Sequence, residues 1–127
     1  MTTSQLMYDY LCRNEMNPED VGGDIYFEHE GRKFIFVNDD RDATFFEIDM
    51  LYLLSVPTDS ADTILRIINN VNCKQKLVKL VLVNGYVNAS AEIILDSSPE
   101  LGDLVPRLIK LLVHAQDAFN SQFAQAV

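Results

Sequence analysis

Three carboxylates are the residues of this sequence best suited to chemistry. Glu47 and Asp49 alternate along one predicted strand, and Glu92 lies on another. Carboxylates on neighbouring strands can share a proton and act as a general acid and base. No nucleophile elbow, phosphate-binding loop, dinucleotide fingerprint or Cys-x-x-Cys motif accompanies them. We therefore expect solvated sheet residues, no catalytic residue and no enzyme.

Possible metal ligands are scattered along the chain. The run Asn38–Asp42 supplies oxygen ligands, but an arginine interrupts it and no glycine follows at the offset of a calcium loop. His29 and His114 are the only histidines, and a zinc site would need both plus a cysteine or carboxylate. Cys12 and Cys73 have no metal-like spacing and are expected as buried free thiols. The sequence predicts neither a metal site nor a cofactor.

Negative charge is concentrated in the N-terminal part of the chain. The formal net charge is -9, and residues 1–50 hold twelve acidic and four basic residues, against seven and six in residues 51–127. Nucleic acids and anionic membrane surfaces reward clustered Lys and Arg, so we expect neither as a partner. A polypeptide with a basic segment is the expected partner. Two other interpretations of the negative charge remain open. It could serve solubility alone, or the chain could be an acidic protein that mimics DNA or neutralises a toxin.

The length of 127 residues is that of one ordinary domain, so residues 1–127 are expected to share one core. Apolar residues make up 48% and charged residues 23%, which excludes a fibrous or disordered chain. No run approaches the roughly 20 apolar residues of a membrane span. No basic region precedes an apolar stretch near the start either. These features predict a cytoplasmic protein.

The first half reads as one helix and three strands. Ser4 is the expected N-cap of an amphipathic helix that ends at Asn17-Pro18. After a Gly-Gly loop, alternation predicts a hairpin of Ile25–His29 and Phe34–Val37. A third strand is expected from Thr44 to Leu54, closed by a proline.

The second half predicts a helix and another hairpin. The helix begins near Thr58–Ser60 and ends around Asn72–Gln75. Two strands, Leu77–Val83 and Tyr86–Leu95, flank Asn84-Gly85, which is the strongest two-residue hairpin signal because a type I′ turn needs positive φ at both positions.

A long apolar helix closes the chain. Ser98 is its expected cap and Pro99 suits the first helical position. Pro106 either bends this helix or marks its true start. The small Ala89 and Ala91 on the preceding strand leave room for the helix to pack closely on the sheet.

The order α-β-β-β-α-β-β-α predicts an α+β domain with a five-stranded antiparallel sheet and three helices, the first and last helices lying on one face. The other face then needs a function, because polar and apolar side chains mix on it as on many interaction surfaces. The candidate partner-binding residues on that face are Glu47, Asp49, Asn88, Ser90 and Glu92.

The second helix has more apolar residues than one sheet face should need. A homodimer that buries the excess is therefore expected, while a role in the core of one chain is the alternative. The candidate interface residues are Ile64, Ile67, Ile68 and Val71.

From residue 24 onward the chain resembles the YbjN-type family of proposed bacterial sensory transduction regulators, which shares the fold of type III secretion chaperones. The resemblance lies in segments 45–48, 67–72, 78–82, 87–92 and 104–108, which look like the helix-strand-strand-helix half of that family. Residues 1–23 match nothing in it. The resemblance implies a homodimeric, non-enzymatic domain that binds another polypeptide, as the secretion chaperones do when effector segments wrap their surfaces and extend their sheets.

The leading hypothesis is therefore a peptide-binding, chaperone-like adaptor that uses the open sheet face. The alternative is a small-ligand sensor whose pocket lies between the sheet and the last helix. That pocket would be lined by Phe34, Phe36, Leu80 and Leu112.

Overall fold

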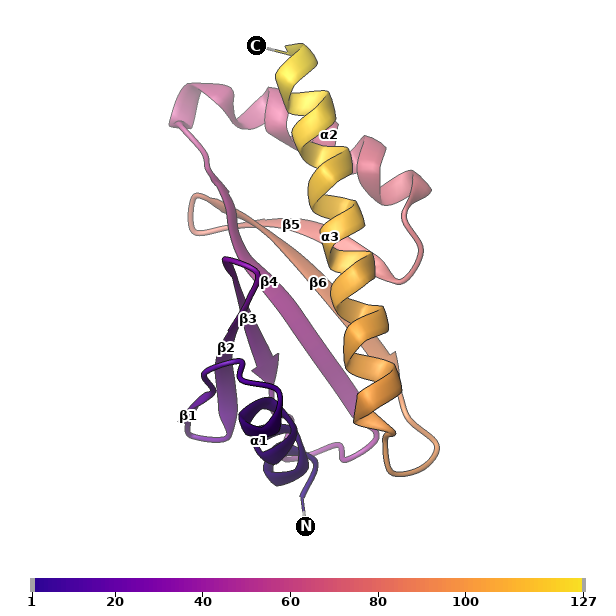
Figure 1. Cartoon of the computed structure of the whole chain (residues 1–127). Coiled ribbons are helices and arrows are strands. Elements are labelled where there is room, and N and C mark those ends of the chain that lie inside the picture. The colour runs from indigo at the N-terminus through magenta and orange to yellow at the C-terminus, as the bar shows by residue number, and fades with distance from the viewer. Residues whose placement is uncertain (1, 127) are drawn as a thin grey trace.

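Three helices lie on one side of a six-stranded antiparallel sheet in the computed structural model, which describes residues 2–126 (Figure 1). The helices are α1 (Thr3–Arg13), α2 (Ala61–Lys74) and α3 (Leu101–Ala126), and a short 3-10 turn, η1 (Thr58–Ser60), precedes α2. The strands are β1 (Glu19–Val21), β2 (Asp24–His29), β3 (Arg32–Val37), β4 (Phe45–Ser55), β5 (Val78–Val83) and β6 (Tyr86–Ile94). Their order across the sheet is β1-β2-β3-β4-β6-β5.

The prediction of five strands was wrong by one, because residues 19–21 form the edge strand β1. All three of its side chains are exposed, so no apolar alternation marks it in the sequence. Its pairing with β2 depends on the turn at Gly22-Gly23, where φ is +66° and +99°. A Cβ on Gly23 would lie 2.7 Å from the Asn38 side-chain nitrogen, so both backbone shape and space favour glycine there.

Helix α1 begins earlier and ends earlier than predicted. Thr2 is the N-cap and forms a capping box with Gln5. The Gln5 N–H donates to the Thr2 side chain, and the Thr2 N–H donates to the Gln5 side chain. Ser4, the expected cap, lies in the first turn and its hydroxyl donates to the Gly23 carbonyl at 2.8 Å. The helix ends at Arg13.

The two predicted hairpins, the long strand between them and the second helix are confirmed with small shifts of their ends. The Asn84-Gly85 turn has positive φ at both residues, as a type I′ turn requires. Strand β6 pairs with both β4 and β5, so the last hairpin joins the sheet through β6 and leaves β5 at the edge.

The core lies between the sheet and the helices. Two rows of directly opposed residues cross the sheet, each side chain at most 2% exposed. They are Ile25, Phe36, Ile48, Ala91 and Val78, and Phe27, Phe34, Met50, Ala89 and Leu80. The small Ala89 and Ala91 face the buried stripe of α3, which packs on β4, β5 and β6. Pro106 lies inside α3, so the alternative in which it starts that helix was wrong.

The apolar face of α2 also belongs to this core. Ile64, Ile67, Ile68 and Val71, the predicted dimer interface, are 0%, 5%, 7% and 1% exposed in the single chain. Packing against α3 and β5 covers them, so they are core residues and offer no surface to a second copy. The homodimer itself stays a prediction that needs another surface.

Among the described residues, none of the helices combines the length and hydropathy of a membrane span.

Candidate functional site

The sheet face opposite the helices carries the predicted partner-binding residues. One complete row of opposed residues crosses it from edge to edge: Glu19, Tyr26, Ile35, Asp49, Ser90 and Lys79. The next row contains Val37, Glu47 and Glu92. We call this surface the open face, because the three helices pack on the other side.

Glu47, Asp49 and Glu92 form an acidic triad at the centre of the open face. Glu47 lies directly opposite Glu92, and Asp49 lies directly opposite Ser90. The Ser90 hydroxyl reaches Glu92 Oε1 at 3.3 Å and Glu47 Oε2 at 3.5 Å, so one buried hydroxyl connects two acids. Like charges placed directly opposite across a sheet repel, so this arrangement is costly unless a proton or a cation intervenes.

Two members of the triad, Glu47 and Asp49, favour their protonated forms. Partial burial, with Asp49 and Glu92 beside it, raises the pKa of Glu47 from 4.5 to about 8. Burial also raises the pKa of Asp49. The Oδ1 atom of Asp49 is buried and has no hydrogen-bond partner among the described residues. Lys79, whose Nζ lies 4.0 Å from Glu92 Oε1, is largely exposed and screens the triad only from one side.

Apolar side chains surround the triad. Ile35, which lies between Tyr26 and Asp49 in its row, is only 9% exposed although it is on the face opposite the helices. Val37, Leu51 and Val81 are half-buried. Ile94, one row beyond Glu92, is 81% exposed, which is unusual for a large aliphatic side chain. The open face thus offers apolar contact area around a half-buried cluster of carboxyl groups.

A bulge in β4 brings aromatic side chains to the same face. The register with β6 shifts between Met50 and Leu54, and Tyr52 within the bulge has φ +61°, an unfavourable conformation for a bulky residue. Its N–H donates to Asn88 Oδ1 at 2.9 Å, and its ring meets Tyr86 edge-on at 5.1 Å. Asn88 therefore positions the bulge.

Tyr26 and Tyr52 line a shallow hollow of about 270 Å³ together with Glu28, Lys33 and Leu51. Tyr52 is 57% exposed. Tyrosine combines a large apolar ring with a polar tip and a face that attracts cations, which makes it a common contact residue at interfaces.

The structure places all five predicted partner-binding residues on β4 and β6, on the open face. It brings Glu47, Asp49, Ser90 and Glu92 into one cluster, while Asn88, two residues before Ser90 on β6, holds the bulge. The sequence reasoning missed the tyrosines. Tyr26 was readable from its alternation with Ile25 and Phe27, but nothing in the sequence reveals that Tyr52 changes face in a bulge.

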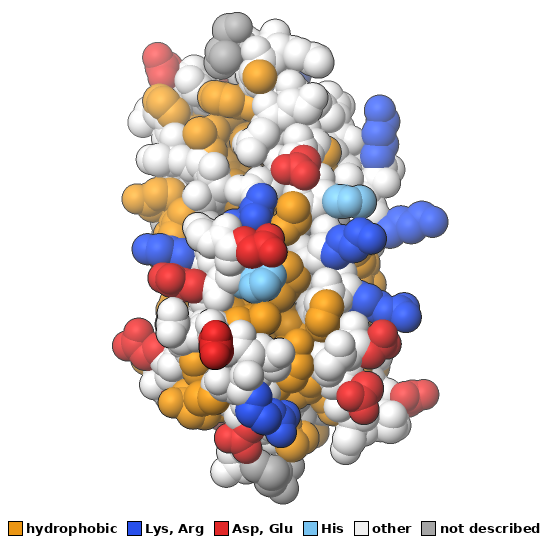
Figure 2. All heavy atoms as spheres, in the orientation of Figure 1, with side chains coloured by type: hydrophobic (Ala, Val, Ile, Leu, Met, Phe, Trp, Pro, Cys, Tyr) orange, Lys and Arg blue, Asp and Glu red, His pale blue; other side chains and the backbone are white. Residues whose placement is uncertain are grey.

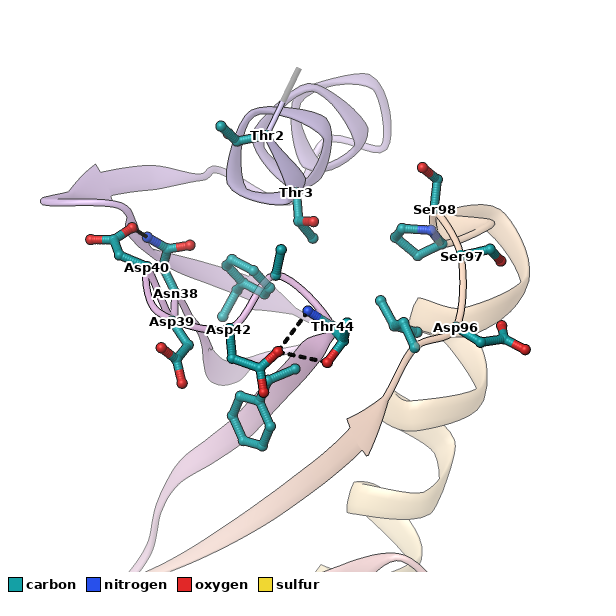
Figure 3. Close-up of a pocket in the computed structure, with 15 residues that line it drawn as sticks. Thr2, Thr3, Asn38, Asp39, Asp40, Asp42, Thr44, Asp96, Ser97 and Ser98 are labelled. Atoms are coloured by element: carbon teal, nitrogen blue, oxygen red, sulfur yellow. Dashed lines mark hydrogen bonds between the residues drawn. The ribbon is translucent and has the colours of Figure 1, made fainter.

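The Asn38–Asp42 run borders a hollow of about 420 Å³ with residues 96–98 and the start of α1 (Figure 3). Its carboxylates serve local turns. Asp42 Oδ1 accepts from the Thr44 N–H at 3.0 Å and from its hydroxyl at 2.6 Å, and these bonds lower the pKa of Asp42. Within residues 2–126 no group of three or more His, Cys, Asp or Glu side chains is arranged to hold a metal ion.

The helix side of the molecule carries an apolar seam between charged side chains (Figure 2). A groove of about 560 Å³ there is lined by Tyr10, Met16, His29, Ile109 and His114, among others. The fold thus brings the two histidines to one groove, which Glu30 and Asp117 also line, but among the described residues these side chains are not arranged to hold a zinc ion. Cys12 and Cys73 are free, as predicted, but exposed, which corrects their expected burial.

The predicted ligand pocket between the sheet and α3 is filled by its own lining. Phe34, Phe36, Leu80 and Leu112 are all at most 2% exposed and pack in the core. Since these side chains occupy the space between sheet and helix, that version of the sensor hypothesis was wrong.

Known proteins resemble this chain in structure and not in sequence. No family model matches the chain, and no curated protein matches it. The crystal structure of YbjN, a proposed transcription regulator from E. coli, matches with a TM-score of 0.73 at 7% identity, over 97% of this chain and 92% of that chain. Identity this low shows the fold alone. The chain therefore has the YbjN-type fold that its sequence pattern predicts.

Proposed function

We propose that this protein is a non-enzymatic regulatory or adaptor domain that binds a polypeptide on its open face. The observation that carries the proposal is the acidic triad, half-buried and ringed by apolar and aromatic side chains on a sheet face that no helix covers. Structural likeness to YbjN, a proposed regulator, supports a regulatory role. The two free cysteines fit a reducing compartment, which supports a cytoplasmic site of action.

The chemistry of the face specifies the partner. A segment with one or two Lys or Arg side chains could place a cation over the triad and replace the proton that Glu47 holds. Apolar residues of the same segment could cover Ile35, Val37 and Ile94, and tyrosine rings could stack on its cations. Burial of the apolar surface would supply affinity, and charge complementarity would supply specificity and a fast encounter.

Site-specific photo-crosslinking in the native lysate tests this proposal. A photoreactive amino acid replaces Val81, which is half-buried on the open face beside the triad. The matched control replaces Leu65, which is exposed on α2 on the opposite side of the sheet. We expect one polypeptide to crosslink from position 81 and not from position 65, through a segment containing Lys or Arg. Its yield should fall as salt concentration rises.

Charge reversal provides the second arm. Glu47→Lys plus Glu92→Lys should abolish the crosslink at position 81, whereas Asp9→Lys plus Asp117→Lys, which makes the same change in formal charge on α1 and α3, should leave it intact. Melting temperatures of all variants check that they fold. A crosslink that survives reversal of the triad, or that forms equally from position 65, would show that the open face is not the contact surface.

A further inference from the structure

Strand β5 is an edge of the sheet, and its outward backbone groups define what can pair with it. Val83 and Tyr86 flank the two-residue turn and bond each other, so by alternation Val81 and Lys79 bond β6, while Val78, Leu80 and Leu82 point their N–H and C=O groups outward. An edge of this kind is a template for another strand.

A side chain already occupies the middle of this edge. Asn72, in the last turn of α2, accepts a hydrogen bond from the Leu80 N–H at 2.7 Å and donates one to the Leu80 carbonyl at 3.1 Å. An asparagine amide has the same donor and acceptor pair as a peptide group, so it satisfies Leu80 as a residue of an added strand would. The Val78 N–H is also occupied, because it donates to the Lys76 carbonyl at 2.7 Å. Of the three outward N–H groups, only that of Leu82 has no such partner among the described residues.

We propose that Asn72 masks the β5 edge, and that this edge, once unmasked, pairs antiparallel with β5 of a second copy of the chain. This inference is independent of the open face and its partner.

The sequence of β5 fits a second copy. Val78–Val83 consists of β-branched and aliphatic residues with one charge, Lys79, which is a strand of high pairing tendency. Two-fold pairing centred on Leu80 sets Lys79 of each copy opposite Val81 of the other, so no like charges are directly opposed. Each Lys79 Nζ stays 4.0 Å from Glu92 Oε1 of its own chain, and this opposite charge reduces the repulsion between the two lysines.

The masking group is well placed to control the edge. Asn72 is half-buried and followed by the exposed residues Cys73 and Lys74, where α2 ends. The last turn of a helix opens more readily than its middle. A small displacement of this turn would release both hydrogen bonds to Leu80 together.

Asn72→Ala tests the proposal directly, with light scattering over a range of concentrations as the readout. We expect its self-association to be tighter than that of the natural chain by about tenfold or more. Asn70→Ala is the matched control, because Asn70 is exposed on the same helix and has no bond to β5 among the described residues. It should associate like the natural chain.

A second variant identifies the edge that pairs. Adding Leu82→Pro to Asn72→Ala removes the outward N–H of residue 82, which an incoming strand would bond beside that of Leu80, while the bonds from β5 to β6 remain. We expect this double variant to return to the natural association state. Asn72→Asp, which can still accept from the Leu80 N–H, keeps the test available if Asn72→Ala does not fold.

Two results would overturn the proposal. One is an Asn72→Ala protein that folds, melts at lower temperature and associates no more than Asn70→Ala, since Asn72 would then only join helix and strand. The other is tighter association that Leu82→Pro leaves unchanged, since the copies would then meet elsewhere. Neither result bears on crosslinking at the open face, so the two proposals fail separately.

Discussion

Glu47 is the residue whose environment departs most from that of an ordinary surface carboxylate. It faces Glu92 directly, has Asp49 two residues away and is half-buried on a face without a helix. Burial disfavours its charged form, so the pKa of Glu47 is about 8 where 4.5 is usual. A residue in this state serves stability poorly and suits a site that exchanges a proton for a cation.

The raised pKa of Glu47 makes stability depend on pH. Because the folded chain holds this proton more tightly than the unfolded chain, the stabilisation is complete below about pH 4.5 and is lost as the pH rises through about 8. We expect the free energy of unfolding to fall over this range by about 1–2 kcal/mol, after allowance for solvent screening. Urea titrations at several pH values measure it.

Glu47→Gln should remove this slope and stabilise the chain at pH 8, because the neutral amide needs no proton. Glu28→Gln is the control, since Glu28 is exposed on the same face. A Glu47→Gln protein with the natural slope would show that another group titrates in this range.

At the scale of an element, the apolar stripe of α2 correctly predicts a buried face, but a second copy of the chain is the wrong neighbour for that face. What covers it is β5 together with α3, which extends beyond the sheet and packs on α2 (Figure 1). Periodicity reports that a surface is covered and does not say by what.

Substitutions on two adjacent residues of α2 separate core from surface. Ile64→Ala removes a fully buried side chain and should lower the free energy of unfolding by about 2–5 kcal/mol. Leu65→Ala removes one that is 48% exposed and should change it by about 0.5 kcal/mol at most. Chemical denaturation measures both. Equal losses at the two positions would contradict the packing of α2 against α3.

At the scale of the whole molecule, stability should decrease from the centre of the sheet to its N-terminal edge. Strands β4 and β6 have partners on both sides and lie under α3. Strand β1 has three exposed residues and one partner. Segments with few buried contacts open locally, while central strands open only when the whole chain unfolds.

Native-state hydrogen exchange tests this gradient. We expect amides of β4 and β6 that bond each other to exchange with the free energy of global unfolding, and those of β1 to exchange at least about tenfold faster. The Leu80 amide, held by Asn72, should be protected although it lies at an edge. Equal protection in β1 and β6 would contradict the gradient.

The sequence by itself determined the element types, most of their limits and the polar face of β4 and β6. Alternation, helical periodicity and the Asn84-Gly85 turn are local signals, and they act over a few residues. It could also predict that Glu47, Asp49, Ser90 and Glu92 share a face, since side chains alternate along a strand.

Only the tertiary structure decided which of these residues meet. The pairing of β4 with β6 places Glu47 opposite Glu92, and strand order is set by contacts between distant segments that no local pattern encodes. Tertiary structure also decides the orientation of Tyr52, which a bulge turns. It decides the contact of Asn72 as well, whose amide bonds Leu80 because α2 packs beside the β5 edge. Each of these features depends on two elements brought together by burial of a common core, which is a property of the whole chain.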